Sequence, residues 1–182
     1  MLQEAYDAGQ RAFGENKVQE MVSKWALLPK DIQWHFIGHL QKNKVKYMAS
    51  FVSLIHGVDS LNTLREIDKQ AKKHQRVISC LLQAKIADET TKFGLPLVEI
   101  QKILSSEELK TMENIKIIGL MGMASFTNDT EQVAKEFRSL KVFFGQTDLA
   151  VLSMGMSGDY HIAIQEGATM IRLGSSIFGA RN

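Results

Sequence analysis

Two segments rich in glycine and serine stand near the end of the chain, and both could hold a negatively charged group. Residues 152–159 read Leu-Ser-Met-Gly-Met-Ser-Gly-Asp, and residues 172–179 read Arg-Leu-Gly-Ser-Ser-Ile-Phe-Gly. Each segment follows an apolar run, so each is predicted to end a strand where backbone N–H groups and hydroxyls converge. Together they predict a phosphate site, whereas a single such turn would more simply be a loop shaped by glycine.

The polar members of these segments are the candidate ligands for an anion. The hydroxyls and the permissive glycines belong to Ser153, Ser157, Ser175, Ser176, Gly155, Gly158 and Gly174. Ser157 can also cap a following helix, which would be a structural role alone.

Arg172 interrupts an apolar strand two residues before Gly174. It is predicted to point into the mouth of the fold, toward a ligand. A buried arginine needs a partner, because an unpaired buried charge is strongly destabilising. The alternative to a ligand is an internal salt bridge with a carboxylate such as that of Glu15.

Four other polar residues are predicted near strand ends: Asn16, His35, His39 and Asp59. Asn16 offers an amide donor and acceptor, and its alternative role is to cap the helix that begins near Val18. His35 and His39 straddle a strand end, but no third residue has the spacing of a metal site, so no metal is predicted. Asp59 is the best candidate for the base of a sugar-phosphate enzyme, although it can equally cap a helix.

Strands that alternate with amphipathic helices must position these residues. The strands are predicted around Phe13, Phe36, Leu54, Ser79, Ile117, Val151 and Ile171. Between them, apolar residues recur at helical spacing, as in the series Leu61, Leu64, Ile67 and Ala71. This alternation is typical of βα units and a parallel sheet.

The number of strands favours a (β/α)8 barrel of the α/β class. Seven strands about 26 residues apart approach the roughly 30-residue period of that fold, which binds phosphate with the loops after its last two strands. The helix predicted over residues 2–8 has no strand before it, so the first strand is expected to be missing. Residues 1–182 are predicted to form one domain. A doubly wound sheet is the alternative, but it would place more than the single Gly14 after the first strand.

Composition argues against several classes of partner. Lys and Arg number 22 and Asp and Glu number 20, so no charge excess predicts nucleic acid or a membrane surface as a partner. The single cysteine, Cys80, cannot form an internal disulfide, which fits a reducing compartment. No apolar stretch approaches the roughly 20 residues of a membrane span, and the N-terminus does not resemble a signal peptide. A cytoplasmic monomer is expected.

Several segments from one end of the chain to the other resemble the YggS/PROSC family of pyridoxal 5′-phosphate (PLP) homeostasis proteins. They are residues 4–16 with 18–20, 34–41 with 43–44, 119–121, 152–157 and 172–181. The opening segment reads Glu-Ala-Tyr-Asp-Ala-Gly-Gln-Arg-Ala-Phe-Gly-Glu-Asn. The family has a fold-type III barrel of the kind found in the N-terminal domain of alanine racemase.

The resemblance implies a PLP site at the C-terminal mouth of the barrel. The cofactor-binding residues would be Asn16, His35, Ser153, Ser157, Arg172, Gly174 and Ser175. Among them Ser153, Gly174 and Ser175 would hold the phosphate. Arg172 would face the pyridine nitrogen, while Asn16 would approach the ring. A cation beside that nitrogen disfavours its protonation, which weakens the cofactor as an electron sink.

This sequence departs from the family pattern at three points. Ser175 and Gly122 stand where threonine is more usual. The family's Schiff-base lysine, in a Val-Ser-Lys motif at the end of the first strand, would lie upstream of Met1. No catalytic residue is therefore predicted, and PLP is expected to bind non-covalently. Three lysines do not match the motif's position: Lys17, Lys42 and Lys44.

The resulting prediction is a PLP homeostasis protein that acts as a carrier or regulator without turnover. It would bind PLP or related B6 vitamers and have PLP-dependent apoenzymes as partners. A fold-type III amino-acid racemase is the alternative, but racemisation needs an acid/base group on each face of a planar intermediate. In related alanine racemases a second domain and a partner subunit supply part of that machinery, whereas this chain ends at Asn182.

Overall fold

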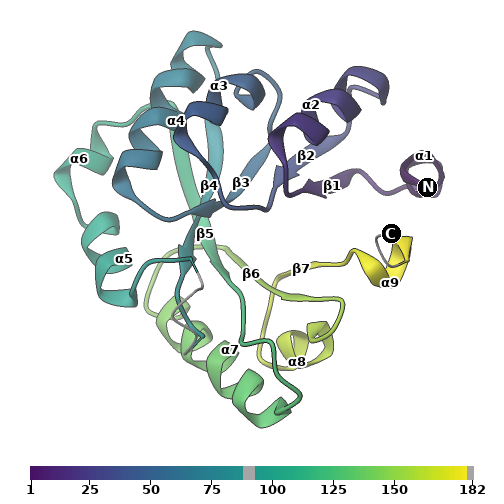
Figure 1. Ribbon diagram of the computed structural model, residues 1–182. Helices are drawn as coiled ribbons and strands as arrows, with labels where there is room; N and C mark the ends of the chain where they lie inside the picture. Colours follow the sequence, from purple (N-terminus) through teal and green to yellow (C-terminus); the bar gives the residue numbers. More distant parts are fainter. Residues whose placement is uncertain (88–92, 180–182) are drawn as a thin grey trace.

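Seven parallel strands form the centre of the molecule, and helices cover the outside (Figure 1). The computed structural model describes residues 1–87 and 93–179. The strands are β1 (Ala12–Glu15), β2 (Gln33–Phe36), β3 (Leu54–Val58), β4 (Ile78–Ala84), β5 (Ile115–Gly122), β6 (Val151–Met156) and β7 (Met170–Arg172). All seven predicted strand centres lie within them.

Helical segments connect and flank these strands. They are α1 (Leu2–Asp7), α2 (Val18–Leu27), the 3-10 helix η1 (Lys42–Lys44), α3 (Val45–Met48), α4 (Leu61–Lys73), α5 (Leu97–Leu104), α6 (Glu107–Lys110), α7 (Thr130–Phe144), α8 (Tyr160–Gln165) and α9 (Ser175–Phe178). Ser60 caps α4, because its hydroxyl accepts a hydrogen bond from the Thr63 N–H. Within the described residues, no helix is both long and apolar enough to cross a membrane.

The strands pair in sequence order from β1 to β7 and curve into a nearly closed barrel. A doubly wound sheet would reverse its strand order at one point, so that alternative is wrong. The prediction of a barrel of α/β class is confirmed. In Figure 1 α1 and α9 lie close together, and residues of both helices line one pocket between them.

The outer face of the sheet carries most of the core. Trp34, Phe36 and Ile55 are fully or almost fully buried there, together with Leu64 of α4 and Phe137 of α7. All residues of β3 are buried, as expected for a parallel strand covered on both faces.

Inside the barrel, an apolar cluster lies below a set of mostly polar side chains. The cluster contains Leu54, Leu81 and Met121, with Val151 and Met170 packed against it. Because residues two apart on a strand share a face, the next inward side chains toward the C-terminal ends come two positions later. They are His56, Gln83, Met123, Ser153 and Arg172. The barrel thus changes from apolar to polar over a single two-residue step.

The ends of β1, β2 and β3 approach one another very closely. A Cβ atom on Gly38 would collide with the main-chain oxygen of Asn16, and one on Gly57 would collide with the main-chain oxygen of Gly38. Glycine is needed at both positions because backbone, rather than a flexible side chain, fills the space.

We therefore expect Gly38→Ala to lower the free energy of unfolding by about 1–3 kcal/mol, the usual cost of forcing extra volume into a packed site. Urea denaturation followed by tryptophan fluorescence measures this change. Gly158→Ala is the matched control, since nothing lies within 4 Å of a Cβ at Gly158. Equal midpoints for the two variants would contradict the role assigned to the close approach.

Candidate functional site

Four polar side chains form a hydrogen-bonded line inside the barrel. His35 Nδ1 lies 3.2 Å from His56 Nε2, and His56 Nδ1 lies 3.1 Å from Ser153 Oγ. The Arg172 guanidinium donates to the same serine oxygen at 2.7 Å and to the Gly122 carbonyl oxygen at 3.1 Å. The line therefore joins β2, β3, β6 and β7, and a second bond of Arg172 reaches the end of β5.

Burial keeps both histidines of this line neutral. Desolvation lowers the pKa of His35 to about 4. The pKa of His56 falls to about 2, first through desolvation and then through the nearby His35 and Arg172. Burial also lowers the pKa of Arg172 to about 10, an effect that Asp159 opposes. At neutral pH the line thus holds two uncharged imidazoles and one cation.

The charge of Arg172 is held by neutral acceptors, a serine hydroxyl and a main-chain carbonyl. The predicted alternative, a salt bridge with Glu15, is wrong. Glu15 is buried on the outer face of β1 and accepts a hydrogen bond from Lys24 of α2. Among the described residues, no carboxylate forms an ion pair with Arg172 in its place.

The loops after β6 and β7 meet at the hydroxyl of Ser157. Its oxygen accepts from the N–H groups of Gly174 at 3.1 Å and Ser176 at 3.3 Å. The expected capping role is wrong, because α8 begins after Asp159 and Ser157 faces the other loop instead. Ser175 is exposed at the start of α9. Two backbone donors therefore converge on one point, as a phosphate oxygen requires.

Gly155 allows β6 to deliver Ser157 to this point. Its φ is +91°, and the pairing of β6 with β7 shifts register between Ser153 and Met156. A side chain there would be strained and would press on Ala163 of α8. The glycine thus bends the strand end toward the β7 loop.

The Ser153 side chain forms its hydrogen bonds with other groups than these loop donors. The sequence prediction grouped it with the phosphate ligands, but its side chain has no exposed surface. Its oxygen lies between Arg172 and His56 inside the barrel. The structure therefore associates Ser153 with the guanidinium.

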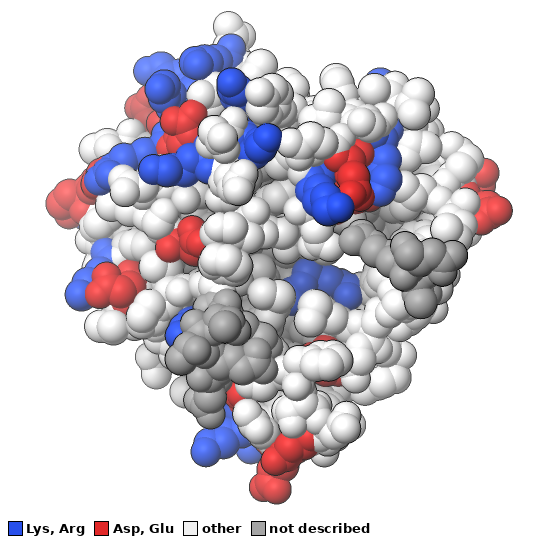
Figure 2. Space-filling view, in the orientation of Figure 1, with Lys and Arg blue, Asp and Glu red and all other residues white. Residues whose placement is uncertain are grey.

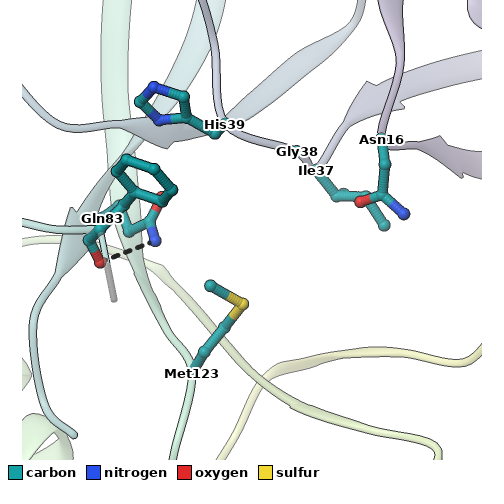
Figure 3. A pocket seen from close by; sticks show the side chains of 7 residues that line it. Asn16, Ile37, Gly38, His39, Gln83 and Met123 are labelled. Carbon is teal, nitrogen blue, oxygen red and sulfur yellow. Dashed lines mark hydrogen bonds between the residues drawn. The ribbon is translucent and has the colours of Figure 1, made fainter. Parts of the chain in front are cut away.

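A pocket of about 260 Å³ opens at the same end of the barrel (Figure 3). It is lined by Asn16, Ile37, Gly38, His39, Gln83, Phe93 and Met123. Figure 3 shows Asn16 and Ile37 on one side of the open space and His39, Gln83 and Met123 on the other. Met123 follows Gly122, whose carbonyl oxygen binds Arg172, so the pocket adjoins the polar line. The serines of the β6 and β7 loops do not line it.

Two of the pocket residues are held by neighbours. The ring of His39 stacks on that of Phe93 with 3.8 Å between centroids, and its Nδ1 lies 3.4 Å from a carboxylate oxygen of Asp59. Gln83 donates to the Phe93 carbonyl oxygen at 3.0 Å. Asn16 is free of the capping role considered for it, since Lys17 precedes α2 and no side chain caps that helix.

His56 is the residue of the polar line that the sequence interpretation missed. It lies two positions after Leu54 in an otherwise apolar strand, which is the same signal that drew attention to Arg172. Gln83, two positions after Leu81, carries this signal too. In the part of the chain that the structure describes, no three His, Cys, Asp or Glu side chains are placed to bind a metal ion.

Figure 2 shows this face of the molecule, which is hollowed near its middle, with atoms of a basic side chain inside the hollow. Side chains of both charges are spread over this face, with no large area of one sign. The open mouth, the guanidinium and the convergent N–H groups together suit a small anionic ligand.

Comparisons with known proteins agree with this geometry. Residues 1–182 match the family model described as alanine racemase, N-terminal domain. The pyridoxal phosphate homeostasis protein of Aquifex aeolicus is 38% identical over 188 residues, which cover 100% of this chain and 82% of that protein. The protein of the same name from Escherichia coli K12 is 35% identical, with coverage of 100% and 80%.

Solved structures show the same likeness. PipY of Synechococcus elongatus with PLP bound is 35% identical, with a TM-score of 0.87 and coverage of 98% of this chain and 86% of that one. Alanine racemase from Bartonella henselae, with covalently bound PLP, is 18% identical with a TM-score of 0.72, covering 96% of this chain and 48% of that one. The second likeness shows a shared fold.

The neutral histidines predict how stability depends on pH. Their folded pKa values lie below the usual 6.5, so the unfolded chain binds more protons as the pH falls below about 6.5. This contribution to stability is complete above that pH and is lost progressively below it. For each histidine that stays neutral in the folded protein, lowering the pH from about 7 to about 5 reduces the free energy of unfolding by up to about 2 kcal/mol.

When the pH is lowered from about 7 to about 5, we expect the free energy of unfolding to fall less in His56→Asn than in the unmodified protein. Urea denaturation at each pH measures this change. His74→Asn is the control, because His74 is exposed and should retain the full loss. An identical pH dependence in the protein with and without His56 would show that this histidine is not held neutral by the fold.

Proposed function

This chain belongs to the alanine racemase N-terminal domain family and to its group of pyridoxal phosphate homeostasis proteins, and we propose that it binds PLP at the mouth of its barrel. The observation that carries the proposal is Arg172, a cation held by Ser153 and the Gly122 carbonyl oxygen, with no ion pair to a carboxylate in the described part of the chain. The relative PipY has been solved with PLP bound, at 35% identity to this chain. The residues present fit this cofactor.

The loop donors suit the phosphate group. The N–H groups of Gly174 and Ser176 already converge on an oxygen atom, that of Ser157. We assign these donors and the hydroxyls of Ser157 and Ser175 to the phosphate. Asn16, at the end of β1, would approach the ring from the pocket side.

Arg172 is assigned to the pyridine nitrogen. When bound, PLP supplies an aldehyde and a ring that can accept electrons. Because the pKa of Arg172 is about 10, its guanidinium keeps its charge at neutral pH. A cation in that position disfavours a proton on the ring nitrogen and so weakens the ring as an electron acceptor. This arrangement favours binding of the cofactor without catalysis.

The role that fits best is a carrier or regulator of PLP without turnover, with PLP-dependent apoenzymes as recipients. The names of its relatives refer to homeostasis, which agrees with this role. The likeness to alanine racemase is at 18% identity, a level that supports the fold and not the reaction.

The two halves of the site predict different losses of affinity. Ser157→Ala should weaken PLP binding but leave the binding of pyridoxal, which lacks the phosphate, unchanged. Arg172→Ala should weaken both ligands by about tenfold or more, the usual value of a charge-assisted hydrogen bond. Fluorescence titration of each variant with each ligand measures these affinities.

Ser50→Ala and Arg65→Ala are the controls, since both residues lie on the exposed surface. Absence of saturable PLP binding by the unmodified chain would overturn the proposal. Equal losses for the two ligands in Ser157→Ala would remove that residue from the phosphate site.

The carrier role has a separate test. The chain loaded with PLP should restore activity to the apo form of a PLP-dependent enzyme, and it should not racemise a panel of amino acids supplied with PLP. Restoration no faster than with free PLP, under conditions of limiting cofactor, would argue against transfer. Measurable racemisation would argue for the enzyme instead.

A further inference from the structure

We propose that His56 is a positioning residue, which gives the buried line a single hydrogen-bond direction from Arg172 to His35. In this direction Ser153 holds the guanidinium, and His35 presents an N–H donor to an oxygen atom of the ligand. The proposal extends the PLP site proposed above, but its structural part concerns the ligand-free protein.

The direction begins at Arg172, whose guanidinium can only donate. Ser153 Oγ therefore accepts from it at 2.7 Å. The hydroxyl hydrogen of Ser153 is then free to donate, and its other side-chain neighbour is His56 Nδ1 at 3.1 Å. If the serine donates there, His56 Nδ1 must be the unprotonated nitrogen.

The rest of the line follows from the chemistry of imidazole. A neutral histidine carries one proton, so His56 with a bare Nδ1 has its hydrogen on Nε2. That atom lies 3.2 Å from His35 Nδ1, which must then accept. His35 in turn carries its own hydrogen on Nε2. The Ser153 hydroxyl and the His56 N–H both have an acceptor in this arrangement.

The reverse direction leaves a donor without a partner. If His56 Nδ1 carried the hydrogen, Ser153 would accept from both His56 and Arg172. Its own hydroxyl hydrogen would then have no acceptor among the described residues, although the Ser153 side chain has no exposed surface. A buried donor without an acceptor is unfavourable. A doubly protonated His56 is disfavoured as well, because it would place a second buried charge near Arg172.

The free end of the line lies at His35. Its Nδ1 contacts His56, and its Nε2 has no hydrogen-bond partner among the described residues. The His35 side chain is only partly buried, whereas His56 and Ser153 are buried, so the line approaches solvent at this residue. The line therefore ends in an N–H donor at the residue nearest solvent. Such a donor selects ligands with a phenolic, carbonyl or carboxylate oxygen on the side facing β2.

The ¹⁵N NMR spectrum of the imidazole nitrogens in the ligand-free protein tests the direction. We expect both His35 and His56 to be neutral and to carry their hydrogen on Nε2, between about pH 6 and pH 8. A hydrogen on Nδ1 of His56, or a protonated His56 in this range, would overturn the proposal. This spectrum requires no PLP, so it can succeed or fail independently of the proposed function.

Two variants test the coupling along the line. His56→Phe removes the acceptor of Ser153 and the donor to His35, and Ser153→Ala removes the oxygen that Arg172 and His56 share. In His56→Phe the hydrogen of His35 should no longer be confined to Nε2. Both variants should weaken PLP binding about fivefold, the worth of one typical hydrogen bond.

His74→Phe is the control, because His74 is an exposed histidine outside the barrel interior. It should change neither the ¹⁵N spectrum of His35 nor the affinity for PLP. If His56→Phe does not fold, Ser153→Ala still tests the coupling through the state of His56. An unchanged His35 spectrum in a folded His56→Phe variant would show that the two histidines are not coupled. Unchanged PLP affinity in both variants would show that the line does not position Arg172.

Discussion

The site depends on a positive charge held inside the barrel by neutral groups. Arg172 donates to a hydroxyl and a carbonyl oxygen, and no carboxylate among the described residues forms an ion pair with it. Withdrawing a guanidinium from water is costly, so the fold must supply acceptors of good geometry. Those acceptors come from β6, which pairs with β7, and from β5, which pairs with β6. The positions of three strands are thereby tied to one side chain.

The location of this charge follows from strand geometry. Inside the barrel, apolar side chains such as Leu54 and Val151 seal the interior, and the next inward residue on each strand is two positions later. At that step the residue is His56 on β3 and Ser153 on β6. Polar side chains can lie at this level because they form hydrogen bonds with one another and lie near the mouth of the barrel. Two residues earlier on each strand, the same groups would be surrounded only by apolar side chains.

Sequence patterns predicted the architecture well, because hydrophobic periodicity and the glycine-rich turns that follow strands are local properties of the sequence. Apolar runs marked all seven strands, and the arginine before a glycine turn marked the charged position. The hydrogen-bond partners of that arginine were not predicted from the sequence. Glu15 was a reasonable partner by charge, but strand alternation turns it outward to Lys24. Which side chains meet across a barrel depends on strand tilt and register, which no local pattern contains.

The same limit explains the contrast between Ser153 of β6 and Ser157, which directly follows that strand. Ser153 and Ser157 look equivalent in the sequence, since both lie in one glycine-rich segment. The positive φ of Gly155 separates them, leaving Ser153 beside Arg172 and sending Ser157 to the N–H groups of the β7 loop. One glycine therefore divides a single segment between the interior of the barrel and the loop that follows β7.

A buried cation and two neutral imidazoles also constrain one another. Arg172 can only donate, so it imposes a direction on the hydroxyl that receives it, and burial prevents the imidazoles from accepting protons to reverse that direction. The charge that would lower the reactivity of a bound pyridine ring thus also organises the donors around it. Replacing Arg172 would consequently disturb two properties together, the electrostatics at the ring and the hydrogen-bond order as far as His35.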